Sequence, residues 1–256
     1  MSILDRVRFN PSFVGHVGLE QEFFLTQKQG SDTIAVPLSK FFLEMMRLDY
    51  GVLSWTYELS SCQVEFRTQP HASVLELLYE LKRNIVLGEY VARLTGCMLE
   101  PNEVMPESGF PLDHFPDTRY LYIVEYLNRV QLSAAMRVAG THVHYGCKDP
   151  KHALRVYNAL RKESPKFIEM GDFSGGERLR LYGLVAGDMV PPEYKSLAEF
   201  DAAAKQYKFD KNLSNCWHLV RITKHGTVEV RAFGNTSDIG VIDSWVSTVK
   251  RIGDSA

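Results

Sequence analysis

The chain has 256 residues, 45% of them hydrophobic and 23% charged, which is typical of a globular protein able to bury a sizeable core. A formal net charge of −2 provides no general field for gathering nucleic acid or anionic membrane. No uncharged apolar run is long enough to span a bilayer, and residues 1–15 lack the apolar core of a secretory signal. The four cysteines form no C-x-x-C pair, so reduced thiols and a cytoplasmic location are expected.

The first predicted strand carries a pair of carboxylates. Successive side chains of a strand alternate between two faces, so Glu20 and Glu22 point together from one of them. The other face is mostly apolar and carries Val17, Leu19, Gln21, Phe23 and Leu25. Two carboxylates this close repel each other unless a cation lies between them, and Mg²⁺ takes oxygen ligands of this kind. An isolated E-x-E is also common on the wet face of a half-exposed strand, so the pair needs support from the rest of the chain.

Strands and helices alternate after this strand without a clear linker, which predicts a single domain over residues 1–256. Residues 27–32 are expected to form a polar turn, and Ser39 is expected to cap a helix that ends at Gly51. Residues 55–67 are then predicted to be extended, with one apolar face and one polar face.

This second extended segment contains two further acidic side chains, Glu58 and Glu65. They are seven residues apart, so one regular strand would place them on opposite faces. Either Glu58 lies in a preceding loop, or a bend near Ser60 and Ser61 turns it back to the face of Glu65. We favour the bend.

The central part of the chain is predicted to be helical on both sides of a loop. Ser73 precedes a long helix with apolar residues at helical spacing. Four prolines between residues 100 and 117 predict a loop at the rim of a cleft. Asp117 or Thr118 is then expected to begin a helix that continues through Val130.

A strand predicted over residues 136–146 contains two histidines. His142 and His144 are two residues apart and therefore share a face. Asp149 and Pro150 are expected to begin the next helix, because a proline at the first helical position lacks only an N–H that the helix does not use.

The C-terminal third is predicted to contain a loop, a hairpin and two helices. Residues 171–195 begin glycine-rich and basic and are expected to be a loop, followed by a short helix around Phe200. Residues 216–233 predict a β-hairpin that turns at Gly226. Residues 235–238 are expected to cap the last helix.

Charged or metal-binding side chains therefore lie opposite an apolar face on four predicted strands. They are Glu20 and Glu22, Glu65, His142 and His144, and Glu229 and Arg231. Each desolvated anion needs a partner, so a purely structural sheet has no reason to carry so many. One sheet with helices on its convex face and a polar concave face would gather them into a single acidic metal site. The alternative is four unrelated strand faces in contact with water.

Four segments resemble the carboxylate–amine ligase superfamily, which includes glutamate–cysteine ligase family 2 and the amidoligases. In chain order they are GLEQEFF, ELSSCQVEF, GTHVHYG and GTVEVRAF. The resemblance extends from about Gly18 to the final helix. It implies an α+β fold in which a curved, mainly antiparallel sheet forms an open cup with helices on its convex face. It also implies ATP and Mg²⁺ on the concave face, and an amide bond made from a carboxylate and an amine through an acyl phosphate.

The resemblance assigns roles by motif position. The metal ligands it implies are Glu20, Glu22, Glu58, Glu65 and Glu229. His142, or His144 two residues on, would lie beside the metal and phosphate, and Arg231 would meet the γ-phosphoryl group. Arg178 and Arg221 would contact phosphate or the substrate carboxylate, although relatives often have a proline where this chain has Ile222. The residues expected to be catalytic are Arg231, Glu65 and His142.

Other functions use some of the same residues. A metal-dependent phosphohydrolase could bind paired metal ions with these carboxylates, but it would need neither ATP nor an amine. A non-catalytic nucleotide- or metabolite-binding protein would need no metal carboxylates. His142 is as compatible with a hydrogen-bonded core position as with a general base. The partners expected of a ligase are a small-molecule or peptide carboxylate and an amine, without nucleic acid or membrane; homo-oligomerisation stays open.

Overall fold

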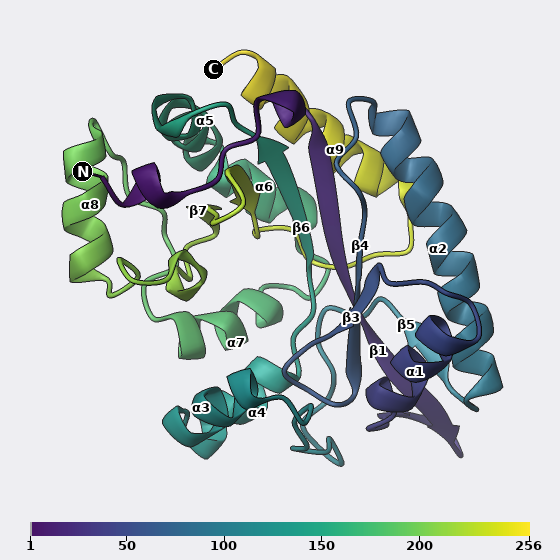
Figure 1. The fold of residues 1–256 in the computed structure, drawn as a ribbon. Coiled ribbons are helices and arrows are strands. Elements are labelled where there is room, and N and C mark those ends of the chain that lie inside the picture. Colours follow the sequence, from purple (N-terminus) through teal and green to yellow (C-terminus); the bar gives the residue numbers. More distant parts are fainter. Residues whose placement is uncertain (1) are drawn as a thin grey trace.

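A mainly antiparallel sheet forms the centre of the molecule (Figure 1). The computed structural model describes residues 2–256, apart from the side chain of Tyr122. Within them the strand order is β3-β4-β1-β6-β8-β7, and β2 and β5 pair with the C-terminal half of β1. The strands are β1 (Val17–Gln29), β2 (Asp32–Ala35), β3 (Trp55–Tyr57), β4 (Gln63–Arg67), β5 (Met98–Glu100), β6 (Thr141–Gly146), β7 (Val220–Ile222) and β8 (Thr227–Val230).

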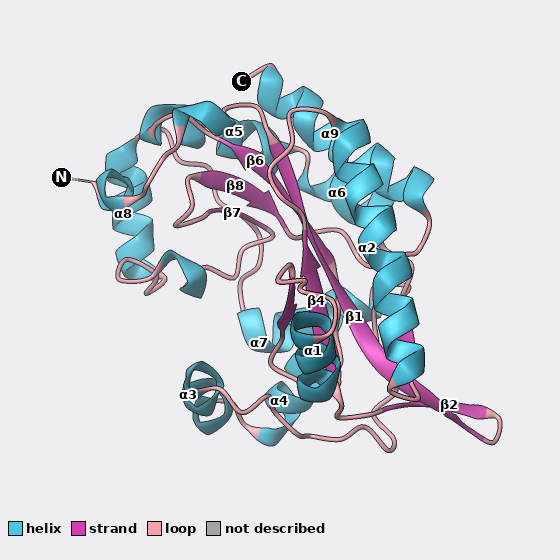
Figure 2. Ribbon diagram, turned by 45° about the vertical axis from the view of Figure 1, so that its right-hand side comes forward, coloured by secondary structure: helices cyan, strands magenta, loops and turns pink. Residues whose placement is uncertain are grey.

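Helices α2 and α9 lie side by side along the apolar face of this sheet (Figures 1 and 2), and α5 packs against β7, β8 and α9. Buried Leu19, Val143 and Val228 belong to the core on this side. The helices are α1 (Ser39–Leu48), α2 (Val74–Leu94), α3 (Thr118–Tyr126), α4 (Arg129–Met136), α5 (Pro150–Lys162), α6 (Ser164–Gly171), α7 (Glu177–Ala186), α8 (Leu197–Gln206) and α9 (Ile239–Asp254). The predicted α+β class, with an antiparallel sheet and helices on its apolar face, is confirmed.

The strand register explains how one face of the sheet collects polar side chains. Residues directly opposite each other on antiparallel strands point to the same face. Glu20 of β1 lies opposite His142 of β6, and Glu22 lies opposite Glu65 of β4. His144 lies opposite Glu229 of β8 in the same way. The alternation predicted for each strand thus places all six side chains on the face away from α2 and α9.

The bend predicted between Glu58 and Glu65 is confirmed. Strands β3 and β4 pair antiparallel, with Thr56 opposite Glu65, so the chain reverses between Tyr57 and Gln63. The hairpin predicted over 216–233 is also present, although its paired strands are shorter, and Gly226 occupies its turn with φ +74°.

Several predicted element boundaries were wrong in the first half of the chain. The predicted turn at 27–32 is shorter, because β1 continues to Gln29 and β2 begins at Asp32. Ser39 does not cap α1 but is its first helical residue. The helix expected to run through Val130 is two helices, because Asn128 makes a capping box with Gln131 and begins α4.

Two further boundaries differ in the second half. Met136 ends α4, so the histidine strand begins at Thr141 and not at 136. The loop predicted over 171–195 contains α7, whose first residues follow two glycines with positive φ, Gly175 and Gly176. The caps expected from Asp149 and from the segment 235–238 are confirmed, since Asp149 and Asp238 each accept a hydrogen bond from the first turn of their helix. No helix of the described residues is both long and apolar enough to cross a membrane.

Candidate active site

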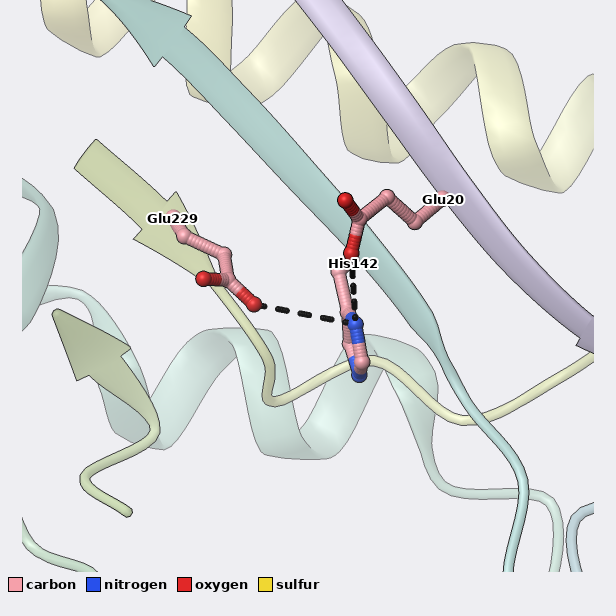
Figure 3. Close-up of side chains that lie close together, drawn as sticks. All are labelled: Glu20, His142 and Glu229. Atoms are coloured by element: carbon pink, nitrogen blue, oxygen red, sulfur yellow. Dashed lines mark ion pairs between the residues drawn. The ribbon is translucent and has the colours of Figure 1, made fainter. Parts of the chain in front are cut away.

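Three neighbouring strands bring Glu20, His142 and Glu229 together (Figure 3). His142 Nδ1 lies 3.6 Å from Glu20 Oε2 and 3.6 Å from Glu229 Oε1. One donor atom from each residue lies within 4.8 Å of the other two, a spacing that could hold a metal ion. These residues come from β1, β6 and β8, which are adjacent in the sheet.

A second group lies on the other side of the same imidazole. It consists of Glu22, Glu65 and His142, whose donor atoms are again within 4.8 Å of one another. His142 Nε2 is 3.9 Å from Glu22 Oε1, so the ring faces both groups. Glu58 belongs to neither group but lies close enough to Glu22 and Glu65 to raise the pKa of both carboxyls.

Glu229 is fully buried and is held between two arginines. Arg221 Nε and Nη2 donate to its two carboxylate oxygens at 2.6 and 3.2 Å, and Arg231 Nη1 donates to Oε1 at 2.5 Å. Burial alone would raise the pKa of Glu229, but Arg221 and Arg231 hold it well below its usual range. The carboxylate is therefore ionised and neutralised by arginine before any ligand arrives.

In the acidic group around Glu22 the pKa values are raised, whereas that of Glu229 is lowered. Burial, reinforced by the nearby Glu58, raises the pKa of Glu22 to about 8. Burial also raises the pKa of Glu65 well above its usual range, with Glu20 and Glu58 adding to the shift. Arg67 forms ion pairs with two of these carboxylates, since its Nε donates to Glu65 and lies 3.5 Å from Glu20.

The pKa values of the two histidines are shifted in opposite directions although the side chains share a face. Burial and the neighbouring Arg231 lower the pKa of His142 to about 4, so its ring is neutral at pH 7. Burial opposes the charged form of His144 too, but Glu20 raises its pKa above the ordinary value. His144 Nδ1 lies 3.0 Å from Thr227 Oγ1. The strand register places both His142 and His144 on the polar face of the sheet, where they were expected.

The residues present fit a divalent cation. The donor set is rich in carboxylate oxygens, which hard cations such as Mg²⁺ prefer, and it includes a neutral imidazole. His142 Nδ1 and His144 Nε2 are buried atoms without a hydrogen-bond partner within the described residues. Buried polar atoms normally have a partner, so these nitrogens favour a site that a ligand completes.

Arg178 was expected in a loop, in contact with phosphate or substrate, and the structure places it on a helix. It lies in the first turn of α7 and is 4% exposed. Its guanidinium donates to the carbonyl oxygens of Ala139, Arg231 and Ala232 at 2.9, 3.1 and 3.4 Å. These bonds give Arg178 a structural role at the ends of two site strands, and its predicted contact with a ligand stays a prediction.

Sequence reasoning missed two side chains that contact the predicted set. Arg67 pairs with Glu65, and its position two residues further along the same strand was the signal for it. Tyr182 of α7 lies with its hydroxyl 3.4 Å from Arg231 Nε. No sequence signal pointed to Tyr182, because it belongs to a helix that was expected to be a loop.

Solved structures with a similar overall fold include the following two. A bifunctional glutathione synthetase from Pasteurella multocida matches with a TM-score of 0.56 and 13% identity, over 94% of this chain and 39% of that protein. The apo form of GmaS matches with a TM-score of 0.53 and 13% identity, over 99% of this chain and 56% of the other. The present chain thus spans about half or less of these two proteins, and at this identity the likeness shows the fold alone.

The sequence is similar to those of glutamate–cysteine ligases. A glutamate–cysteine ligase from Halobacterium salinarum is 25% identical over 252 residues, covering 91% of this chain and 68% of the relative. That of Haloferax volcanii is 25% identical over 238 residues, covering 85% and 64%. Together with the fold, these relatives define the class of protein as a carboxylate–amine ligase, an enzyme that forms a carbon–nitrogen bond. Residues 16–169 match the model of glutamate–cysteine ligase family 2, and the chain belongs to this family.

Proposed function

We propose that this chain is an ATP-dependent ligase that joins a carboxylate to an amine through an acyl phosphate and releases ADP and phosphate. The observation that carries the proposal is the pairing of Glu229 with Arg231 on one face of the sheet, with a separation of 2.5 Å between Arg231 Nη1 and Glu229 Oε1. This pairing places a carboxylate that can bind a metal ion directly beside a guanidinium that stays charged. This combination suits the phosphates of ATP.

The proposed reaction has two steps. A carboxylate is a poor electrophile, so one oxygen of the acid substrate first attacks the γ-phosphorus of ATP, and the bond to the β–γ bridging oxygen breaks to leave ADP. The amine nitrogen then attacks the acyl carbon, and inorganic phosphate departs with the electrons of the broken carbon–oxygen bond. Bound Mg²⁺ would neutralise charge on the phosphates, which is the main requirement of phosphoryl transfer.

The residues of the chain take distinct parts in this proposal. The divalent cations would be held by Glu20, Glu22, Glu65 and Glu229. Arg231 would stabilise the transferring phosphoryl group, and Arg221 would keep Glu229 ionised and oriented. His142 is neutral at pH 7 and can accept the proton that the attacking amine loses.

All of these residues come from one sheet, apart from Arg231, which directly follows β8. We treat residues 1–256 as one catalytic domain. The acid and the amine would be small molecules or peptides, and ATP would be supplied by the cytoplasm. The loop at 100–117 and the segment 171–195 lie next to strands that carry the site residues, through the bridge of Val104 to Val138 and the Arg178 bonds. These two segments are the parts of the chain that we expect to select the substrates.

The proposal is tested by the nucleotide product. Pools of carboxylic acids and amines are incubated with the protein, ATP and Mg²⁺, and nucleotides are separated by chromatography. We expect ADP and phosphate, released only when an acid is present, and a hydroxamate when hydroxylamine replaces the amine. AMP and pyrophosphate would contradict the acyl-phosphate route, and release of phosphate without any acid would favour a phosphohydrolase.

The role of Arg231 is tested separately with Arg231→Lys, which keeps the charge and loses the planar fork. We expect kcat to fall on the order of 10³-fold while the Kd for ATP changes only slightly, because the lost contact belongs to the transition state. Arg180→Lys is the matched control, since Arg180 lies on α7 and pairs with the exposed Glu177. An equal loss of ATP affinity and kcat would assign Arg231 to ground-state binding instead.

A further inference from the structure

A buried polar cluster lies on the apolar face of the sheet, directly behind the candidate site. Gln21 is fully buried between Leu19 and Phe23, where the strand pattern calls for an apolar residue. Thr141, directly opposite on β6, is also fully buried. An apolar side chain at position 21 would avoid the desolvation of an amide, so burial alone does not explain this glutamine.

Both side chains contact Asn235, which follows β8 and is 4% exposed. Asn235 Oδ1 accepts hydrogen bonds from Gln21 Nε2 at 2.8 Å and from Thr141 Oγ1 at 3.4 Å. Asn235 Nδ2 donates to the backbone carbonyl of Glu22. One amide therefore joins β1 at Glu22, β6 at the residue before His142, and the segment that leads out of β8.

The segment that carries Asn235 is itself fixed. The backbone N–H of Asn235 lies 3.4 Å from Glu103 Oε1, which also accepts the N–H of Phe173 at 2.9 Å. A Cβ at the preceding Gly234 would lie 1.8 Å from Glu103 Oε1, so only glycine allows this approach. Asn235 thus cannot shift along the sheet without breaking the contacts of Glu103.

We propose that Asn235 is a positioning residue, which sets the separation of Glu22, His142 and Glu229 and so the affinity of the site for divalent cations. This inference rests on the proposed function, because it assumes that these residues bind a metal ion. Partners behind metal ligands orient them, and losing such a partner typically weakens metal binding roughly 10- to 100-fold.

The test compares Asn235→Ala with a matched control, Asn84→Ala. Asn84 is 5% exposed and its amide donates to the backbone carbonyl of Glu80 at 2.9 Å within α2, so it makes the same kind of bond away from the site. Mn²⁺ serves as the probe, titrated by electron paramagnetic resonance without nucleotide or substrate, and urea unfolding is measured in EDTA. We expect Asn235→Ala to lower the urea midpoint more than Asn84→Ala, because it removes three side-chain hydrogen bonds instead of one. We expect Mn²⁺ affinity to fall at least about tenfold in Asn235→Ala only.

A second variant keeps the test decisive if Asn235→Ala does not fold. Gln21→Leu continues the apolar face but removes the amide that donates to Asn235 Oδ1 and to the backbone carbonyl of Thr236, while Thr141 still donates to Oδ1. Its urea midpoint should fall less than that of Asn235→Ala, and its Mn²⁺ affinity should still fall. Wild-type affinity in Gln21→Leu or Asn235→Ala, within twofold, would overturn the positioning role and leave the proposed function intact. Failure of the unaltered protein to bind Mn²⁺ would overturn both.

Discussion

The two sides of His142 have opposite electrostatic surroundings. On one side Glu229 accepts hydrogen bonds from Arg221 and Arg231, and its pKa lies well below the usual range. On the other side Glu22 and Glu65 are crowded with Glu58, and their pKa values are raised. The basic partner there, Arg67, is 48% exposed and so less effective than a buried guanidinium.

The difference shows how the charge on each side of His142 is balanced when no ligand is bound. The Glu229 side is neutralised by the chain itself, so it can hold its geometry before ATP arrives. On the Glu22 side, burial and the neighbouring Glu58 outweigh Arg231 and Arg178, which lower the pKa of Glu22, so protons stay bound there at neutral pH. A divalent cation would replace those protons, which couples metal binding to proton release. Mutations on the two sides should therefore change stability in opposite directions.

The largest effect is expected from Glu229→Gln. The change removes the charge that Arg221 and Arg231 share and leaves two largely buried cations close to each other. Removing one partner of a buried ion pair typically costs about 3–5 kcal/mol. We expect a loss of this size in the free energy of unfolding, measured with urea in EDTA.

The matched control for this prediction is Glu177→Gln, which removes the exposed partner of Arg180. A surface pair contributes only about 0–1 kcal/mol, so the control should be nearly neutral. If Glu229→Gln were equally neutral, the two arginines would not depend on the carboxylate, and the contrast between the two sides would fail.

The arrangement that underlies this comparison was largely predictable from the sequence. The period of two places Glu20 and Glu22 on one face, and the same rule applied to each strand predicted the shared face of His142 and Glu229. The reversal after Glu58 could also be predicted, because without it Glu58 and Glu65 would point apart. The alternation of side chains along a regular strand is therefore enough to predict which residues share a face.

Features that depend on distant partners could not be predicted. Arg178 follows two glycines, so its segment was expected to be a loop, and nothing local shows that its donors reach carbonyls 39 to 54 residues away. The break between α3 and α4 was missed because apolar residues keep their helical spacing across it, and only the cap at Asn128 marks the second start. Gln21 on an apolar face was the one visible sign of the Asn235 cluster.

The pH dependence of stability should sharpen the contrast. The pKa of Glu22 is raised to about 8 from a reference of 4.5, so the folded state keeps a proton that the unfolded state releases. Stability that this group contributes at low pH is therefore lost as pH rises from about 4.5 to 8. In EDTA the free energy of unfolding should fall by about 3–4 kcal/mol between pH 5 and 8, since a full proton corresponds to about 1.4 kcal/mol per pH unit and the two states differ by nearly one proton over most of this range.

Glu22→Gln should flatten this dependence, because glutamine does not titrate. Glu44→Gln, which changes an exposed carboxylate on α1, should leave the slope as it is in the unaltered protein. Urea midpoints at half-unit pH intervals provide the measurement. An unchanged slope in Glu22→Gln would assign the titration to a group other than Glu22 and contradict this explanation.

The smallest effect is expected from Glu65→Gln, and its sign is the informative part. The raised pKa means that Glu65 opposes folding at pH 7, so removing its charge should stabilise the metal-free protein, while the lost bond from Arg67 offsets part of the gain. We expect the free energy of unfolding in EDTA to stay level or rise by about 1 kcal/mol. The increase in melting temperature that Mg²⁺ produces should shrink, because a ligand stabilises a fold only in proportion to its affinity. A clear loss of stability in the metal-free variant would instead make Glu65 a structural partner of Arg67, and both sides of His142 would then be held together by ion pairs.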